Sequence, residues 1–192
     1  GHPLDSFTAA LERLPNHVVD LTEADGITGL ADNANVLVGG MLTGCKQKPT
    51  KSGSGLMGYC NLEGVTGSVE CVLFPRTIQQ YGALFHDDMP VLASGRLNIR
   101  DERANSLLIE SLEPLGNAPS ATVYLKFDLL TDEAMQRAAA FLKQFPGGTP
   151  VVLFYAAKRA SKSAPKSLYV NATEAFLAEA ERTFGKDHVV IK

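Results

Sequence analysis

The feature that most constrains this chain is a pair of adjacent glycines inside an apolar segment that has the character of a β-strand. Residues 35–45 read NVLVGGMLTGC, and Gly39 and Gly40 stand in the middle of that run. A glycine inside a strand marks a sharp bend or a bulge, because it lets another backbone approach closely. We therefore expect residues 35–45 to form a strongly bent strand.

The segments that follow predict four more strands and one helix. Pro75 suits the first position of that helix, and Ile78, Tyr81 and Phe85 share one face of it. The resulting order is β-β-β-α-β-β, which is that of a five-stranded all-β OB barrel. The predicted strands cover residues 35–45, 56–62, 68–74, 89–99 and 106–112.

Beyond residue 121 the pattern changes to alternating strands and amphipathic helices. Thr131 and Thr173 each precede an apolar stripe at helical spacing, and both suit the N-cap position. This unit is predicted to be a small α+β domain with the order βαββαβ, its strands covering 122–129, 151–156, 167–171 and 188–191. The predicted domain plan is 1–33 for an N-terminal helix with an acidic connector, 34–114 for the OB barrel, 115–121 for a linker and 122–192 for the α+β interaction domain.

The composition excludes several classes of protein. Hydrophobic residues make up 45% and charged residues 20% of the chain, which is typical of a globular protein. No apolar run reaches the roughly 20 residues of a membrane-spanning helix, and the first residues lack the order of a signal peptide, so we expect neither. Cys45, Cys60 and Cys71 are odd in number and show no CxxC spacing, which favours reduced thiols in a cytoplasmic protein.

No enzymatic site is predicted from the sequence. The four histidines do not lie at metal-ligand spacing, and the motifs of serine hydrolases, zinc proteases and nucleotide-binding loops are absent from the sequence. We therefore expect the chain by itself to be non-catalytic, with no metal and no cofactor.

A local basic surface with an aromatic residue at its centre is predicted instead. The net charge of −3 excludes a chain that is basic throughout, so an anion site has to be a patch. An OB barrel binds its ligand on strands 2 and 3, between the loop joining strands 1 and 2 and the loop joining strands 4 and 5. The first of these loops, expected over residues 46–55, carries Lys46, Lys48 and Lys51, and the second is bordered by Arg96, Arg100 and Arg103.

On the second strand, alternation separates two faces. If Gly58, Cys60 and Leu62 face the core, then the outer face presents Met57, Tyr59 and Asn61. Tyr59 could stack on a base and Asn61 could hydrogen-bond to a base edge. In the second domain, a basic loop could serve a protein partner through Lys158, Arg159, Lys162 and Lys166.

The order and spacing of several short motifs resemble one known family. The whole chain is similar to the C-terminal region of the bacterial replicative DNA polymerase III alpha subunit. Tyr59 stands where this family often has Phe, and Gly64 stands where an Asp is common. The most specific stretches are His2-Pro3-Leu4-Asp5, Lys48-Pro49-Thr50-Lys51, Met57-Gly58-Tyr59, Thr66-Gly67-Ser68-Val69-Glu70, Phe74-Pro75, Gly95-Arg96 and Arg100-Asp101-Glu102.

The resemblance implies a function that spacing alone does not give. The OB domain would hold single-stranded template DNA, and the C-terminal domain would bind the tau subunit of the clamp loader in a cytoplasmic replisome. The catalytic domain of the polymerase, with its Mg²⁺, would lie in the rest of the polymerase chain. Two alternatives stay open: an anticodon-binding OB module of an aminoacyl-tRNA synthetase, and a purely architectural module whose OB face packs on protein.

Overall fold

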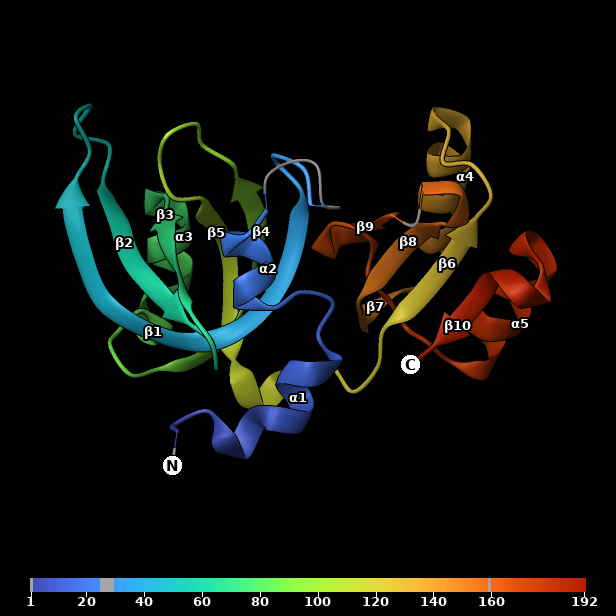
Figure 1. The fold of residues 1–192 in the computed structure, drawn as a ribbon, viewed down its shortest axis with the longest axis horizontal. Coiled ribbons are helices and arrows are strands. Elements are labelled where there is room, and N and C mark those ends of the chain that lie inside the picture. The colour runs from blue at the N-terminus through green and yellow to red at the C-terminus, as the bar shows by residue number, and fades with distance from the viewer. Residues whose placement is uncertain (1, 25–29, 159) are drawn as a thin grey trace. The chain divides into compact units, whose positions relative to one another are not determined.

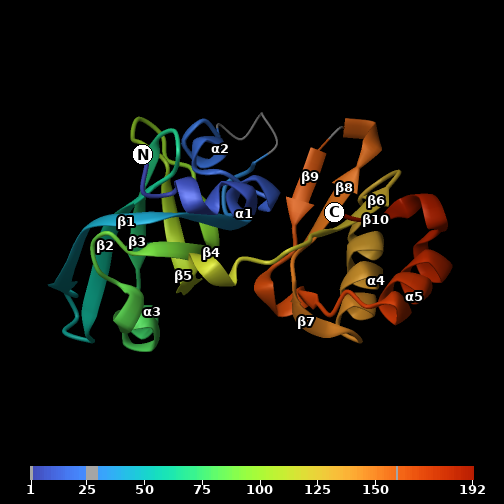
Figure 2. The same ribbon diagram turned by 90° about the horizontal axis from the view of Figure 1, so that it is seen from below.

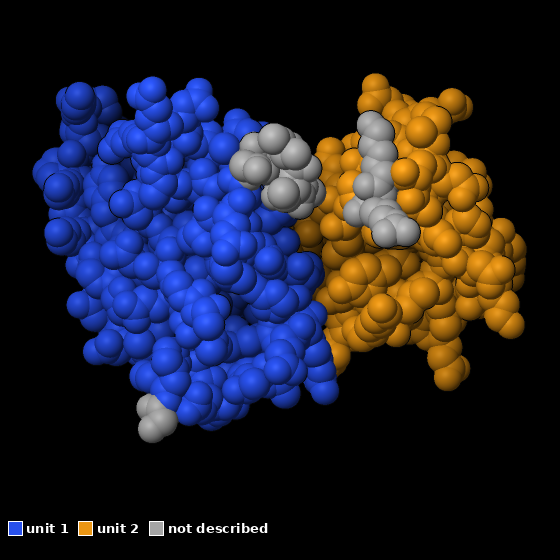
Figure 3. Space-filling view, in the orientation of Figure 1, with its two compact units in different colours: residues 1–118 blue, residues 119–192 orange. Residues whose placement is uncertain are grey.

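The chain folds into two compact units. The computed structural model describes residues 2–24, 30–158 and 160–192. Unit 1 comprises residues 1–118 and unit 2 comprises residues 119–192 (Figure 3). Each unit has its own hydrophobic core, so each is described separately.

Unit 1 is a closed five-stranded barrel, as the sequence predicted (Figure 1). Around the barrel the strands follow the order β1-β2-β3-β5-β4, with β3 and β5 parallel and the other pairs antiparallel. Helix α3 lies between β3 and β4 along the chain, also as predicted. The bounds are β1 Asn35–Pro49, β2 Leu56–Glu63, β3 Ser68–Leu73, α3 Pro75–Tyr81, β4 Pro90–Asn98 and β5 Ser106–Pro114.

Strand β1 bends at the glycine pair and takes part in both sides of the barrel. Its first half pairs with β4 and its second half with β2, and Met41 pairs with both. A Cβ atom at Gly40 would lie 2.6 Å from the Glu63 carbonyl oxygen, so a side chain has no room there. The strand also runs further than predicted, to Pro49, because β2 continues the ladder as far as the pair Pro49–Leu56. The prediction of a loop over 46–55 is therefore wrong for its first four residues.

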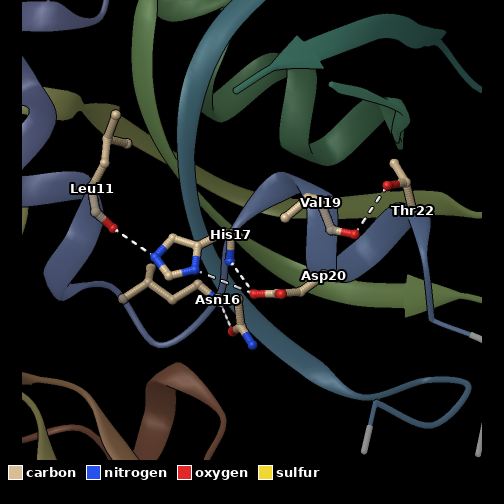
Figure 4. Close-up of polar contacts among 7 residues, drawn as sticks. Leu11, Asn16, His17, Val19, Asp20 and Thr22 are labelled. Carbon is tan, nitrogen blue, oxygen red and sulfur yellow. Dashed lines mark hydrogen bonds and ion pairs between the residues drawn. The ribbon is translucent and has the colours of Figure 1, made fainter. Parts of the chain in front are cut away.

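The N-terminal segment belongs to unit 1. A 3-10 turn (Asp5–Phe7) leads into α1 (Thr8–Arg13), and a second helix that the sequence did not predict follows, α2 (Val18–Thr22). The backbone nitrogen of His17 donates to the Asp20 carboxylate at 2.9 Å at the start of α2 (Figure 4). Val18 and Leu21 of α2 are buried in the barrel core. Residues 25–29 of the predicted acidic connector lie outside the described residues.

Unit 2 has two layers, a four-stranded sheet with both helices packed on one face (Figure 2). The sheet order is β10-β6-β8-β9, and only β6 and β8 are parallel. Thr131 and Thr173 cap the two helices as predicted, their side-chain oxygens accepting from the backbone nitrogens of Ala134 and Phe176. The bounds are β6 Val123–Phe127, α4 Asp132–Leu142, β7 Pro146–Thr149, β8 Val151–Tyr155, β9 Ala160–Ser163, α5 Glu174–Phe184 and β10 Val189–Ile191.

One strand of unit 2 lies where the sequence predicted a loop. Residues 160–163 form β9 inside the expected basic loop, whereas the strand predicted over 167–171 is replaced by a 3-10 turn at Lys166–Leu168. The sequence ASKS of β9 shows no apolar alternation, because an edge strand needs no apolar face to be paired. The short β7 is a strand that the sequence did not predict, and it bridges to Val170. In the part of the chain that the structure describes, no helix is long and apolar enough to cross a membrane.

Candidate nucleic-acid interface

The outer face of β1, β2 and β3 has the alternation that the sequence predicted. Gly58, Cys60 and Leu62 are buried in the barrel, whereas the Tyr59 side chain is 39% exposed. Lys46 lies directly opposite Tyr59 on β1. Directly opposed residues of antiparallel strands project from the same face, so the lysine and the tyrosine share the outer surface.

A groove of about 360 Å³ runs over this face and collects most of the predicted site. Four cations line it against a single carboxylate, that of Glu70, so the described lining is strongly positive. Val72, which the sequence analysis did not select, also lines the groove because it lies directly opposite Tyr59. The predicted residues that line it are Lys46, Lys48, Tyr59, Asn61, Arg100 and Arg103.

Lys46 and Lys48 are carried by a paired strand. Both extend from β1 and both are exposed. The Lys48 Nζ atom lies 5.8 Å from the centroid of the Tyr59 ring, within the range of a cation–π interaction. The arrangement places a positive charge beside an exposed aromatic ring, which is the pair of features that a nucleotide's phosphate and base require.

Arg100 and Arg103 differ in their partners. The Nη2 atom of Arg100 donates to the Glu70 carboxylate at 2.8 Å, and its Nε atom donates to the Ala104 carbonyl oxygen at 2.8 Å. These contacts fix the Arg100 side chain and neutralise its charge within the groove. Arg103 is exposed and lies in the turn between β4 and β5.

Three of the predicted residues are not among those lining the groove. Arg96 lies on β4, where its Nη1 atom donates to the Asn33 side chain at 3.3 Å and its Nε atom lies 3.5 Å from the Glu110 carboxylate. Lys51 is exposed in the six-residue loop that follows β1. Met57 is half-buried and lies opposite Lys48, so it extends the outer face beyond Tyr59.

The three cysteines, which were predicted only to be reduced thiols, lie close to one another at the groove. Cys60 and Cys71 lie directly opposite each other on β2 and β3, and both line the groove. Burial, reinforced by the neighbouring Cys60 and by Asp87, raises the pKa of the Cys45 thiol to about 12. Burial also raises the pKa of Cys71 well above its usual value. In the β2–β3 hairpin Glu63 pairs with Ser68, and the same register pairs Cys60 with Cys71. A hairpin with its turn at residues 64–67 therefore predicts from the sequence that these two cysteines lie opposite each other.

The predicted partner site of unit 2 is only partly described. Lys162 is exposed on β9, and Lys166 begins the 3-10 turn that follows. Lys158 ends a 3-10 turn, and Arg159 lies outside the described residues. Among the described residues of the whole chain, no three His, Cys, Asp or Glu side chains converge as metal ligands would.

Comparison with known proteins finds similarity to one family over the barrel and to one group of proteins over the whole chain. Residues 36–115 match the family model described as "OB-fold nucleic acid binding domain". The DNA polymerase III subunit alpha of Bacillus subtilis is 24% identical over 196 residues, an alignment that covers 100% of this chain. The chain resembles the polymerase III alpha subunits along its whole length.

The alpha subunits of other bacteria match most of the chain. That of Deinococcus radiodurans is 30% identical and that of Thermus aquaticus 29%, and each alignment covers 80% of this chain and 12% of the relative. The chain spans 17% of the length of the Bacillus subtilis alpha subunit, so it corresponds to a small part of such a protein.

Solved structures are similar to less than half of the chain. The SSB domain of a Synechococcus protein aligns with 42% of this chain and 93% of its own, with a TM-score of 0.39 and 11% identity. The mitochondrial single-stranded DNA binding protein Rim1 of S. cerevisiae aligns with 44% of this chain and 97% of its own, with a TM-score of 0.37 and 8% identity. At this level of similarity they add nothing to the sequence comparison.

Proposed function

We propose that unit 1 binds single-stranded DNA, without sequence preference, across the outer face of β1, β2 and β3. The observation that carries the proposal is the groove itself, in which Lys46 and Lys48 flank the exposed ring of Tyr59. Base–aromatic stacking contributes about 1–3 kcal/mol per base and tolerates every base, because each has a π-face. In a duplex the bases are already stacked on one another, so the tyrosine favours a single strand.

The predicted residues that line the groove each have a role in this proposal. The Tyr59 ring stacks on a base, and the Asn61 side chain, on the same face, hydrogen-bonds to a base edge. Lys46, Lys48 and Arg103 bind phosphates, and Arg100 does so only in competition with Glu70. Arg96 is removed from the phosphate-binding set because it is held by Asn33 and Glu110 outside the groove.

The chain would then act as a non-catalytic part of a polymerase alpha subunit. The relatives that match it are alpha subunits, and it spans a small fraction of their length. A weak grip on the template raises the local concentration of DNA at an active site carried by the rest of the polymerase. Phosphodiester chemistry and its Mg²⁺ would belong to that remaining part of the protein, in a cytoplasmic replisome.

Unit 2 would dock to a protein partner, for which the family resemblance suggests the tau subunit of the clamp loader. The edge strand β9 supports this proposal, because an exposed edge can add a strand from another chain. The anticodon-binding alternative is not favoured. The relatives that align with most or all of this chain are polymerase subunits rather than tRNA synthetases.

The test is a binding titration with a dye-labelled oligothymidylate at low salt. Wild-type chain is compared with Tyr59→Ala and with the matched control Tyr124→Ala in unit 2. We expect single-strand binding that Tyr59→Ala weakens about 5- to 150-fold, while the control is unchanged and duplex DNA and an RNA hairpin compete poorly. Absence of binding at low salt would reject the proposal and assign the face to protein packing.

A further inference from the structure

The outer face continues beyond the groove to an aromatic residue that no part of the proposed function uses. Phe74 directly follows β3, and its side chain is 51% exposed, whereas the preceding Leu73 is buried. The backbone of Phe74 is extended, with φ −72° and ψ 161°, so it continues the alternation of the strand. Its side chain therefore lies on the same face as Tyr59 and Val72.

The strand register orders this face into two successive rows. The first row consists of Lys46, Tyr59 and Val72, which lie directly opposite one another. In the second row Lys48 lies opposite Met57. Leu73 is paired with Gly58, so the next residue along the chain, Phe74, comes opposite Met57. Each row thus carries a lysine on β1 and an aromatic ring on β2 or at the end of β3.

The two rows are separated by two residues along each strand, which is about 7 Å. In a stacked strand successive bases advance by only about 3.4 Å. A strand that places one nucleotide on each row must therefore be stretched, with its two bases separated from each other. Duplex DNA cannot adopt this spacing while its base pairs stay stacked, whereas a flexible single strand can.

The loop after β1 extends the line of positive charge in the same direction. Gly55 packs so closely on α3 that a Cβ atom there would lie 2.9 Å from the Cβ atom of Pro75, the neighbour of Phe74. The loop carries the exposed Lys51, which follows Lys46 and Lys48 along the chain. Within the two rows the cations therefore lie on β1, whereas the rings lie on β2 and at the end of β3. This division of charge fits a polyanion whose backbone follows β1 and whose bases lie over the rings.

We propose that Phe74 is a second base-stacking residue and that the two rows hold two successive nucleotides of an extended single strand. The inference rests on the proposed function and deepens it by giving the site a register. Tyr59 takes one base and Phe74 takes its neighbour, while Met57 lies beside Phe74 in the second row.

The test uses the full chain, an oligothymidylate of 15 nucleotides and low salt. Phe74→Ala is expected to weaken binding about 5- to 150-fold, similar to the loss expected for Tyr59→Ala. Val65→Ala is the matched control, since Val65 is 58% exposed and lies in the turn at the opposite end of the β2–β3 hairpin. The control is expected to bind as tightly as the wild type.

A second variant separates stacking from folding. The chain contains no tryptophan, so Phe74→Trp introduces a single tryptophan, whose emission can be followed apart from that of the tyrosines and whose ring can still stack. Its emission is expected to be quenched on addition of oligothymidylate, with affinity close to wild type. If Phe74→Ala binds normally and the tryptophan shows no quenching while Tyr59→Ala binds weakly, the second position is rejected and the proposed function stands. If the wild type does not bind at all, both fail together.

Discussion

The salt dependence of DNA binding can be worked out from the cations of the groove. Binding of single strands weakens with salt at a log–log slope of about −0.7 for each phosphate that is neutralised. Arg100 is paired with Glu70, which leaves Lys46, Lys48 and Arg103 to neutralise phosphates. Three contacts predict a slope of about −2.1, or a loss of about 18-fold in affinity between 50 and 200 mM salt.

Replacing two of these cations should change the slope by a defined amount. In the double variant Lys46→Gln/Lys48→Gln one phosphate contact remains, so the slope should become shallower, at about −0.7. The same increase in salt should then lower the affinity only about 2.6-fold. Fluorescence anisotropy of a dye-labelled oligothymidylate at four or more salt concentrations measures the slope directly. The control is Lys143→Gln/Lys186→Gln, which removes two exposed lysines from unit 2.

The comparison of these two variants decides whether the groove binds the phosphates. A wild-type slope that persists in Lys46→Gln/Lys48→Gln would refute the assignment, because the counterions would then be released elsewhere. A reduced slope in the unit 2 control would lead to the same conclusion, since those lysines lie outside the groove.

Three further predictions concern other contacts. Glu70→Gln frees Arg100 and removes the one carboxylate of the groove, so binding should tighten several-fold and its salt slope should steepen by about 0.7; unchanged binding would show that the ion pair has no influence on the ligand. A Cβ atom at Gly95 would clash with the Leu108 carbonyl oxygen, so Gly95→Ala should lower the free energy of unfolding by about 1–3 kcal/mol in urea titrations, and an unaltered midpoint would contradict this. The Cys45 thiol, with its pKa raised to about 12, should react slowly with a disulfide reagent at pH 8, and its rate should still be rising steeply above pH 10; a rate that is half-maximal near pH 9 would show an ordinary thiol. Since the folded-state pKa is the raised one, the stabilisation from this thiol is present below pH 9 and is lost as the pH rises towards 12.

The β2–β3 hairpin of the barrel was predictable because its two strands are buried on one face only. Period-two alternation in 56–62 and 68–74 identified the hairpin, and the exposed position of Tyr59 followed from it. The glycine pair indicated the bend of β1, since a close approach of backbones excludes other residues. Alternation and a pair of adjacent glycines are local patterns, so they can be recognised in the sequence of one chain.

Other features depend on contacts between distant segments and were missed. The sequence of β1 after Cys45 is polar and basic, so nothing local distinguishes it from a loop, and only pairing with β2 makes it a strand. Helix α2 is five residues long, too short for a helical period, and it forms because Val18 and Leu21 enter the barrel core. Arg96 likewise lies outside the groove because of the path that β4 takes along β1. The positive charge of Arg96 in the sequence does not indicate this position.

The extension of β1 to Pro49 has a consequence for how binding is achieved. Lys46 and Lys48 stand on a backbone that the ladder with β2 already holds in place. A mobile loop would lose conformational entropy worth about 1–2 kcal/mol for each residue that the ligand ordered. The strand avoids this cost for both lysines, so the free protein already has its charges at the spacing that the bound strand requires. Association should then proceed without a slow rearrangement step, at a rate governed by diffusion and electrostatic attraction.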